Sequence, residues 1–123
     1  GGRYGWKRVF NEETVLDFTS KSEIMKSSSY GLGWDTPSGK SSGGIYLSDN
    51  SFGHTGYTGT SLWIDRENQL FVILLTNAVH PNRSYKKKSY FDWRQRLHSS
   101  VYEAVGLTQQ NQNLELRERW LQK

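Results

Sequence analysis

Residues 52–77 decide the fold, and they read FGHTGYTGTSLWIDRENQLFVILLTN. Leu62-Trp63-Ile64 has the composition of a strand, residues 65–68 supply polar turn chemistry, and residues 69–77 resume an extended pattern. We therefore predict an antiparallel hairpin.

The second arm of this hairpin is apolar on both faces, with Leu70, Val72 and Leu74 on one side and Phe71, Ile73 and Leu75 on the other. A strand covered on both faces needs layers above and below it, so the sequence predicts an α+β fold in which helices flank both sides of an antiparallel sheet.

Glycines recur at every third position in the first part of this stretch, as Gly53, Gly56 and Gly59. Because these positions lack a Cβ, another backbone or a substrate can come close to the chain. Thr55 and Thr58 keep hydroxyl groups in the same space. This combination is typical of a binding strand.

Two helices are predicted outside this stretch. The first is placed at about 12–19, where Asn11 can cap the first turn through its side-chain oxygen and Glu12 and Glu13 suit the positive end of the helix dipole. The second is placed at about 89–105, because apolar residues fall near helical spacing there and Gly106 supplies a stop.

The remaining segments are more irregular. Residues 30–34, YGLGW, alternate large and minimal side chains, which favours a strand with something packed against its glycine face. Residues 109–113 have the composition of a polar linker, and residues 114–121 contain apolar positions suited to a short helix that docks or frays.

Composition excludes several classes of protein. The 123 residues contain no cysteine, which rules out disulfide frameworks and cysteine-based zinc sites. His54, His80 and His98 have no metal-ligand spacing, and no Gly-Lys-Ser/Thr follows the glycines as in a phosphate-binding loop. We therefore expect no metal and no cofactor. The longest apolar run, residues 70–75, is far too short to span a membrane.

The net charge of +4 comes mostly from one segment, residues 83–96, which predicts a basic patch. Aromatic residues are interleaved with the cations, as in proteins that contact phosphates and stack on bases. A nucleic-acid-binding domain is therefore one alternative function. We favour a solvated loop leading into a helix whose aromatic residues face the core, because a run of charges is usually a solvated face.

Several blocks, in order, resemble the serine β-lactamase and penicillin-binding protein superfamily, specifically the C-terminal part of its class C-like hydrolases and esterases. The blocks are Gly1-Gly2-Arg3-Tyr4, Glu13-Thr14-Val15, Gly31-Leu32-Gly33-Trp34-Asp35, His54-Thr55-Gly56 with Tyr57-Thr58-Gly59-Thr60, Leu62-Trp63-Ile64-Asp65, Leu75-Thr76-Asn77 and His80-Pro81. The resemblance covers residues 1–106, as the C-terminal portion of a β-lactamase-like domain, and leaves 107–123 as an unmatched C-terminal tail.

The resemblance implies a function for the glycine-rich stretch. The third motif of the family is usually Lys-Thr-Gly on a strand that lines the catalytic cleft, and His-Thr-Gly is a variant in its hydrolase branch. By position, His54 and Thr55 would bind the substrate carboxylate or leaving group, with Gly56 and Thr58 in the same substrate-binding block. The backbone N–H of Tyr57 would be one of two oxyanion-hole donors. The implied reaction is hydrolysis of an ester, amide or β-lactam in a small-molecule or peptide substrate through an acyl-serine intermediate.

The chain departs from the family at the nucleophile. Ser-x-x-Lys and Tyr-x-Asn or Ser-x-Asn normally precede the Thr-Gly strand. Residues 84–87, SYKK, and residues 48–50, SDN, match these patterns literally, but the first follows the strand and the second stands too close to His54. We interpret both as coincidences. The chain also begins at Gly1 and not at Met.

We therefore expect the nucleophile to lie in a missing N-terminal part of the same domain. The isolated chain would then be inactive, and residues 69–77 would have an unpaired apolar edge that invites self-association. The resemblance also suggests a periplasmic, secreted or cell-envelope location. A non-catalytic module that keeps the fold as a binding surface remains a further alternative.

Overall fold

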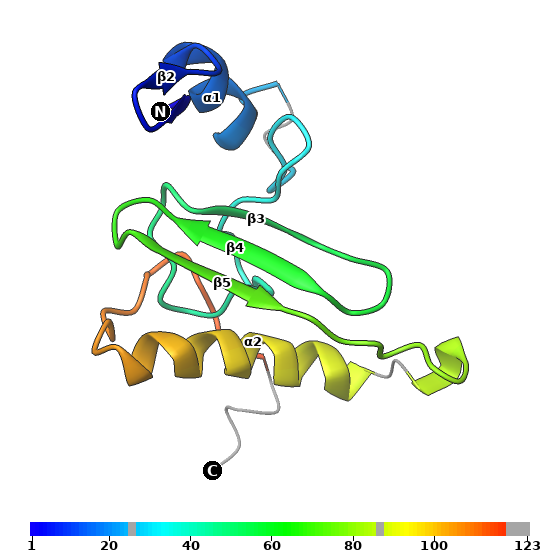
Figure 1. Cartoon of the computed structure of the whole chain (residues 1–123). Helices are drawn as coiled ribbons and strands as arrows, with labels where there is room; N and C mark the ends of the chain where they lie inside the picture. The colour runs from blue at the N-terminus through cyan, green and yellow to red at the C-terminus, as the bar shows by residue number, and fades with distance from the viewer. Residues whose placement is uncertain (25–26, 86–87, 118–123) are drawn as a thin grey trace.

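A three-stranded antiparallel sheet lies at the centre of the computed structural model, which describes residues 1–24, 27–85 and 88–117. Its strands are β3 (Phe52–Thr55), β4 (Ser61–Asp65) and β5 (Leu70–Leu74), in that order across the sheet (Figure 1). β4 pairs with β5 so that Trp63 lies opposite Val72, which confirms the predicted hairpin. β5 is an edge strand of this sheet.

The carboxylate of Asp65, at the end of β4, joins three segments of the chain by hydrogen bonds. It accepts hydrogen bonds from the Ser48 N–H (3.1 Å) and hydroxyl (2.6 Å), from the Asn68 N–H (3.1 Å) and side-chain amide (2.8 Å), and from the Tyr102 hydroxyl (2.9 Å). Burial alone would raise the pKa of Asp65, but the donors on Ser48 and Asn68 outweigh it and hold this pKa below its usual value. Burial, together with the charge of Asp65, raises the pKa of Tyr102 well above its usual range. The buried carboxylate is therefore ionised and fully engaged.

One long helix, α2 (Lys88–Ala104), runs along one side of the sheet (Figure 1). It confirms the helix predicted at about 89–105. The helix ends in a Schellman arrangement, in which Gly106 has a φ of +78°, its N–H donates to the Glu103 carbonyl and the Leu107 N–H donates to the Tyr102 carbonyl. Gly106 therefore acts as the stop that the sequence indicated.

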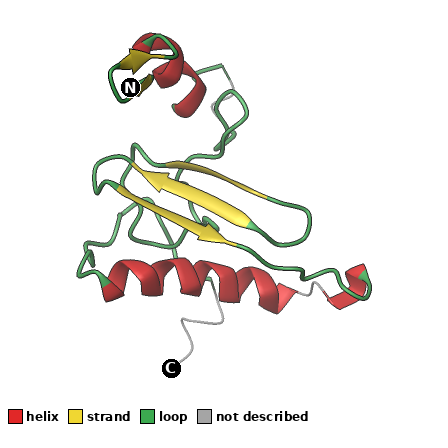
Figure 2. Cartoon of the chain, viewed as in Figure 1, coloured by secondary structure: helices red, strands yellow, loops and turns green. Residues whose placement is uncertain are grey.

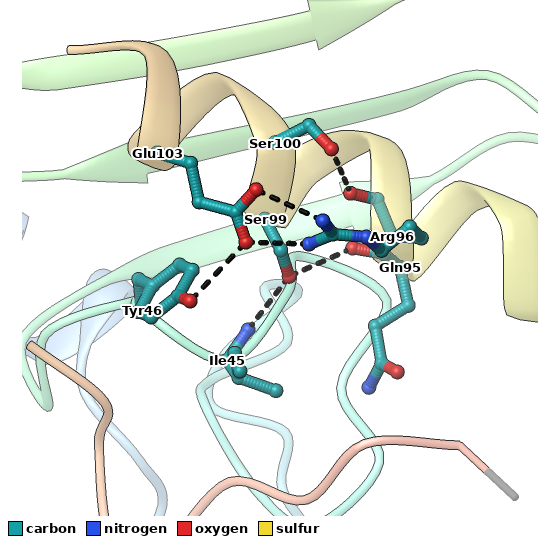
Figure 3. Close-up of polar contacts among 7 residues, drawn as sticks. All are labelled: Ile45, Tyr46, Gln95, Arg96, Ser99, Ser100 and Glu103. Carbon is teal, nitrogen blue, oxygen red and sulfur yellow. Dashed lines mark hydrogen bonds and ion pairs between the residues drawn. The ribbon is translucent and has the colours of Figure 1, made fainter. Parts of the chain in front are cut away.

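The buried face of α2 is more polar than its apolar spacing suggested. Gln95, His98 and Ser99 are fully buried, whereas Val105, which was predicted as the last helical residue and lies just after α2, is 56% exposed. The Ser99 hydroxyl donates to the Gln95 carbonyl and accepts from the N–H of Ile45 (Figure 3). Hydrogen bonds as well as apolar contacts therefore hold α2 against the loop that precedes β3.

Gln95 joins α2 to two distant segments. Its side-chain amide donates to the carbonyls of Ser41 (3.1 Å) and Glu115 (2.9 Å), and its side-chain oxygen accepts from the N–H of Arg117 (2.9 Å). Leu114 bridges Gly39 in parallel and is 2% exposed. The tail through residue 117 thus packs on the body of the chain.

The core is made of one apolar cluster from the loop before β3, the sheet, α2 and the tail. Its buried members are Ile45, Leu47, Trp63, Val72, Tyr102 and Leu114. The short helix predicted for residues 114–121 is wrong for 114–117, which are not helical, because hydrogen bonds to Gly39 and Gln95 hold them extended. Its remainder lies outside the described residues. The predicted domain boundary at residue 106 stays a prediction.

The N-terminal residues form a small separate lobe of β1 (Arg3–Tyr4), β2 (Lys7–Arg8) and α1 (Glu12–Thr19), seen above the sheet in Figure 1 and joined to it by a long loop segment in Figure 2. α1 confirms the helix predicted at about 12–19. Asn11 stands at its N-cap, but its side chain makes no capping hydrogen bond, so that part of the prediction is wrong. The lobe buries little apolar surface, since Trp6 is 96% exposed.

The strand predicted at 30–34 is also wrong. The Gly31 N–H donates to the Trp34 carbonyl and Gly33 has a φ of +94°, so the segment turns back on itself. Only single bridges form, from Asp35 to Tyr30 and to Gly53. Trp34 nevertheless packs edge-on against Phe52 of β3, with ring centroids 5.2 Å apart.

A helical layer on both faces of the sheet is not found in the described residues. α2 covers the face that carries Trp63 and Val72, but on the other face Phe71 and Ile73 are 66% and 55% exposed. Alternation along β5 explains the difference, because its odd-numbered residues point away from α2. The apolar pattern of β5 was correctly identified, but only one of its faces is covered here.

A buried serine–histidine pair lies between β4 and α2. The Ser61 hydroxyl and the Nε2 atom of His98 are 2.8 Å apart, and both residues are at most 4% exposed. The Nδ1 atom of His98 has no hydrogen-bond partner among the described residues. Burial lowers the pKa of His98 to about 4, and the positive charge of Arg94 acts in the same direction. His98 is therefore neutral at pH 7.

We predict that Asp65→Ala lowers the free energy of unfolding by about 3 kcal/mol or more, because the buried Tyr102 hydroxyl loses its acceptor together with the donors of Ser48 and Asn68. Tyr102→Phe removes one donor to this ionised carboxylate and should cost less, about 1.5 to 2 kcal/mol. Urea unfolding followed by tryptophan fluorescence measures both values. Equal effects of the two variants would show that the carboxylate does not organise this region.

We predict that stability falls as the pH is lowered from about 6.5 to about 4. Unfolded histidine has a pKa of about 6.5, so in this range the unfolded chain binds a proton that folded His98 does not. The stabilisation is complete above the unfolded pKa and amounts to at most about 3 kcal/mol.

The measurement is urea unfolding at a series of pH values for the wild type, His98→Gln and the exposed control His80→Gln. His98→Gln should flatten the pH dependence, and His80→Gln should leave it unchanged. The assignment to His98 fails if the His98→Gln curve keeps the wild-type slope.

Candidate functional site

The end of β3 carries the first two predicted site residues. His54 lies opposite Leu62 and is exposed, and Thr55 lies opposite Ser61 and is half-buried. Successive residues of a strand point to opposite faces, so His54 lies on the outer face and Thr55 on the face toward α2. The ring of Tyr30 meets the His54 ring edge-on, with centroids 6.1 Å apart. His54 is therefore available to a ligand on the outer face of the sheet.

A tight turn, residues 56–60, follows β3 and leads into β4. The Gly56 N–H donates to the Thr60 carbonyl (2.8 Å), and the Gly59 N–H donates to the Gly56 carbonyl (3.0 Å). A Cβ on Gly56 would lie 2.1 Å from the Thr60 hydroxyl, and one on Gly59 would lie 2.6 Å from the Tyr90 hydroxyl. Side chains of the chain itself thus come so close to Gly56 and Gly59 that a larger residue would not fit at either position.

The next two predicted residues lie within the turn. The Tyr57 side chain is 65% exposed, and the guanidinium of Arg83 lies over its ring at 5.4 Å. The carbonyl of Thr58 accepts hydrogen bonds from the Ala78 N–H (2.8 Å) and the Thr76 hydroxyl (3.2 Å). The structure therefore brings all five predicted residues, 54–58, to one end of the sheet, where the segment after β5 holds the turn.

Sequence reasoning missed three contributors to this end of the molecule. They are Thr76 after β5, Arg83 in the 3-10 helix η1 (Arg83–Tyr85), and Tyr90 in the first turns of α2. Thr76 was part of a quoted family block, Arg83 was counted in the basic segment, and Tyr90 was counted both as an apolar helix position and as an aromatic residue of that segment. The one signal in the sequence was Gly59, because a glycine at such a position indicates that another group packs closely against the backbone. The sequence alone does not say which residue that group belongs to.

The two literal matches to upstream motifs have structural roles. The Ser48 hydroxyl binds Asp65, and the Asp49 carboxylate accepts from the side-chain amide of Asn111 (2.8 Å). Ser84 hydrogen-bonds to Asn82 through its N–H and its hydroxyl, while Lys86 and Lys87 lie outside the described residues. The Ser61–His98 pair is buried, so a substrate does not reach it.

The predicted basic patch is broken up by the fold. Arg94 is 4% exposed, and its guanidinium lies 5.5 Å from the Phe91 ring centroid. Burial lowers the pKa of Arg94, and nearby Arg117 adds to this while Tyr90 opposes it. Arg96 forms a two-point ion pair with Glu103, which also accepts from the Tyr46 hydroxyl (Figure 3). The prediction of one basic patch is therefore wrong for Arg94, which is buried, while Glu103 offsets the charge of the partly exposed Arg96.

A cavity of about 650 Å³ opens at the opposite end of the sheet, and none of the predicted site residues lines it. Its walls are residues 46–49, 67–68 and 106–113. In the described part of the chain, no group of three or more histidine and acidic side chains is placed to hold a metal ion. None of the helices formed by the described residues has the length and apolar character needed to cross a bilayer.

Comparison with known proteins confirms the family resemblance. The sequence profile of the beta-lactamase family matches residues 12–97, more than half of the chain. Putative D-alanyl-D-alanine carboxypeptidases of Salmonella gallinarum, Salmonella paratyphi B and Salmonella newport are each 36% identical to it over 83 residues. The match covers 65% of this chain and 19% of each relative, so the chain spans about a fifth of their length. No solved structure matches significantly. The α+β chain therefore belongs to the beta-lactamase family of serine hydrolases.

Proposed function

We propose that this chain supplies one wall of an acyl-serine hydrolase site, formed by His54, Thr55 and the turn at 56–60. The observation that carries the proposal is that exposed His54 and the Tyr57 turn lie together at the end of β3, in a chain of this family. The substrate is a small molecule or peptide with an ester, amide or β-lactam bond.

The proposed chemistry divides the work between this chain and a serine outside it. When the serine oxygen attacks the carbonyl carbon, its proton passes to the lysine of the same motif, and the carbonyl oxygen takes up the displaced electron pair and becomes an oxyanion. The Tyr57 N–H donates to that oxyanion, and losing one such donor typically costs ~3 kcal/mol of transition-state stabilisation. His54 hydrogen-bonds to the substrate carboxylate or the leaving group on the outer face of the sheet, and Thr55, Gly56 and Thr58 complete the proposed substrate-binding wall at the strand end.

We propose that the serine and its lysine lie on a preceding part of the same domain. Two features of the sheet support this. β5 has an unpaired edge within the described residues, and the outer face next to it exposes Phe71 and Ile73. A further strand and an apolar layer would bury both, and the same layer would pass close to His54 on that face.

We predict that the isolated chain hydrolyses neither nitrocefin nor a p-nitrophenyl ester above the rate of a heat-denatured control. Co-expression with the serine-bearing part of a Salmonella relative should give a complex that turns over the ester. Replacing the serine of that part by alanine should abolish the activity. Turnover by the chain alone would contradict an external nucleophile.

In the active complex, we predict that His54→Ala lowers kcat/KM by about tenfold to a hundredfold, the range expected for a lost hydrogen bond to a charged group. His80→Ala is the matched control, because His80 is also exposed but lies outside the strand end. Equal activities of the two variants would remove His54 from the site.

A further inference from the structure

The turn at 56–60 is anchored from outside by one hydroxyl of α2. The Tyr90 hydroxyl donates to the Gly59 carbonyl (2.5 Å) and lies 2.9 Å from the Thr76 hydroxyl. Thr76 in turn donates to the Thr58 carbonyl (3.2 Å). Two consecutive carbonyls of the turn are thus held by side chains that come from other elements.

The packing at this contact leaves no room for a side chain on Gly59. Gly59 has a φ of +96°, and a Cβ there would lie 2.6 Å from the Tyr90 oxygen and 2.9 Å from the Thr76 oxygen. The turn therefore rests directly on the two hydroxyls. A displacement of the Tyr90 oxygen would move Gly59 with it.

The position of Gly59 determines the direction of the Tyr57 N–H. The N–H of Gly59 donates to the Gly56 carbonyl at 3.0 Å. That carbonyl and the Tyr57 N–H belong to the same planar trans peptide, so they point in opposite directions. With the Gly56 carbonyl directed into the turn, the Tyr57 N–H is directed away from it.

We infer that Tyr90 is a positioning residue of the proposed site, whose hydroxyl aims the Tyr57 N–H through Gly59 and the Gly56 carbonyl. This inference rests on the proposed function, because only there does the direction of that N–H matter. Tyr90 does not touch the reacting atoms. It acts through the turn, and it fixes the donor before substrate arrives, which is what oxyanion stabilisation requires.

The decisive variant is Tyr90→Phe, which removes only the hydroxyl. The ring contacts remain possible, since the Tyr90 ring packs on Phe91 and Trp93 at 6.1 Å and lies under the Arg94 guanidinium at 5.7 Å. Tyr102→Phe is the matched control. It removes a hydroxyl from the same helix, but one that binds Asp65 at the other end of the sheet.

The first measurement is amide hydrogen exchange of the ¹⁵N-labelled chain. Relative to amides of β4, Tyr90→Phe should speed the exchange of the Gly59 and Ala78 amides at least about fivefold, because the turn loses its external anchor. Thr76→Val should do the same. Tyr102→Phe should change no amide of the turn selectively. Unchanged Gly59 and Ala78 exchange in Tyr90→Phe would overturn the inference.

The second measurement is kinetic and uses the active complex described above. Tyr90→Phe should lower kcat about tenfold with KM within about twofold, the pattern of an interaction made only in the transition state. Tyr102→Phe should leave both constants unchanged. A loss in KM alone, or the same loss in both variants, would overturn the positioning role. If no complex is active, the proposed function fails, and the exchange result alone decides whether Tyr90 holds the turn.

Discussion

The fold depends on the buried carboxylate of Asp65. An ionised carboxylate is costly to remove from water, and here five hydrogen bonds from three segments offset that cost. Ser48 brings in the loop before β3, Asn68 closes the β4–β5 turn, and Tyr102 brings in α2. Each of these groups would be left without its acceptor if another arrangement formed. The register of the hairpin and the placement of the helix are therefore fixed at the same point.

The elements that the sequence predicted well are those with local signals. The β4–β5 hairpin follows from polar turn residues between two apolar runs, and α2 follows from helical spacing and the stop at Gly106. The side of α2 that is buried was not predictable in the same way. Gln95 is buried because the carbonyls of Ser41 and Glu115 lie within reach of its amide, and these partners are far away in the sequence. The strand predicted at 30–34 was wrong for a related reason. A positive φ at Gly33 turns the chain there, and the alternating sequence pattern does not reveal it.

The same division holds for the candidate site. Residues 54–58 were identified from their glycines, hydroxyls and order of motifs, and the structure gathers them at one strand end. Whether they act as the resemblance implies stays a prediction. Their supports, Thr76 and Tyr90, come from elements that meet the turn only after folding. Gly59 reveals the need for such a support, but the identity of the support is a property of the tertiary structure.

The two tyrosines of α2 have one more consequence. Tyr90 holds the turn before β4 and Tyr102 holds the carboxylate at the end of β4, and they are about 18 Å apart along the helix at ~1.5 Å per residue. Because α2 is held near both ends of β4, it can neither slide along that strand nor rotate against it. Any rearrangement of this strand end therefore has to come from the exposed parts of the turn, while the helix stays fixed against the strand.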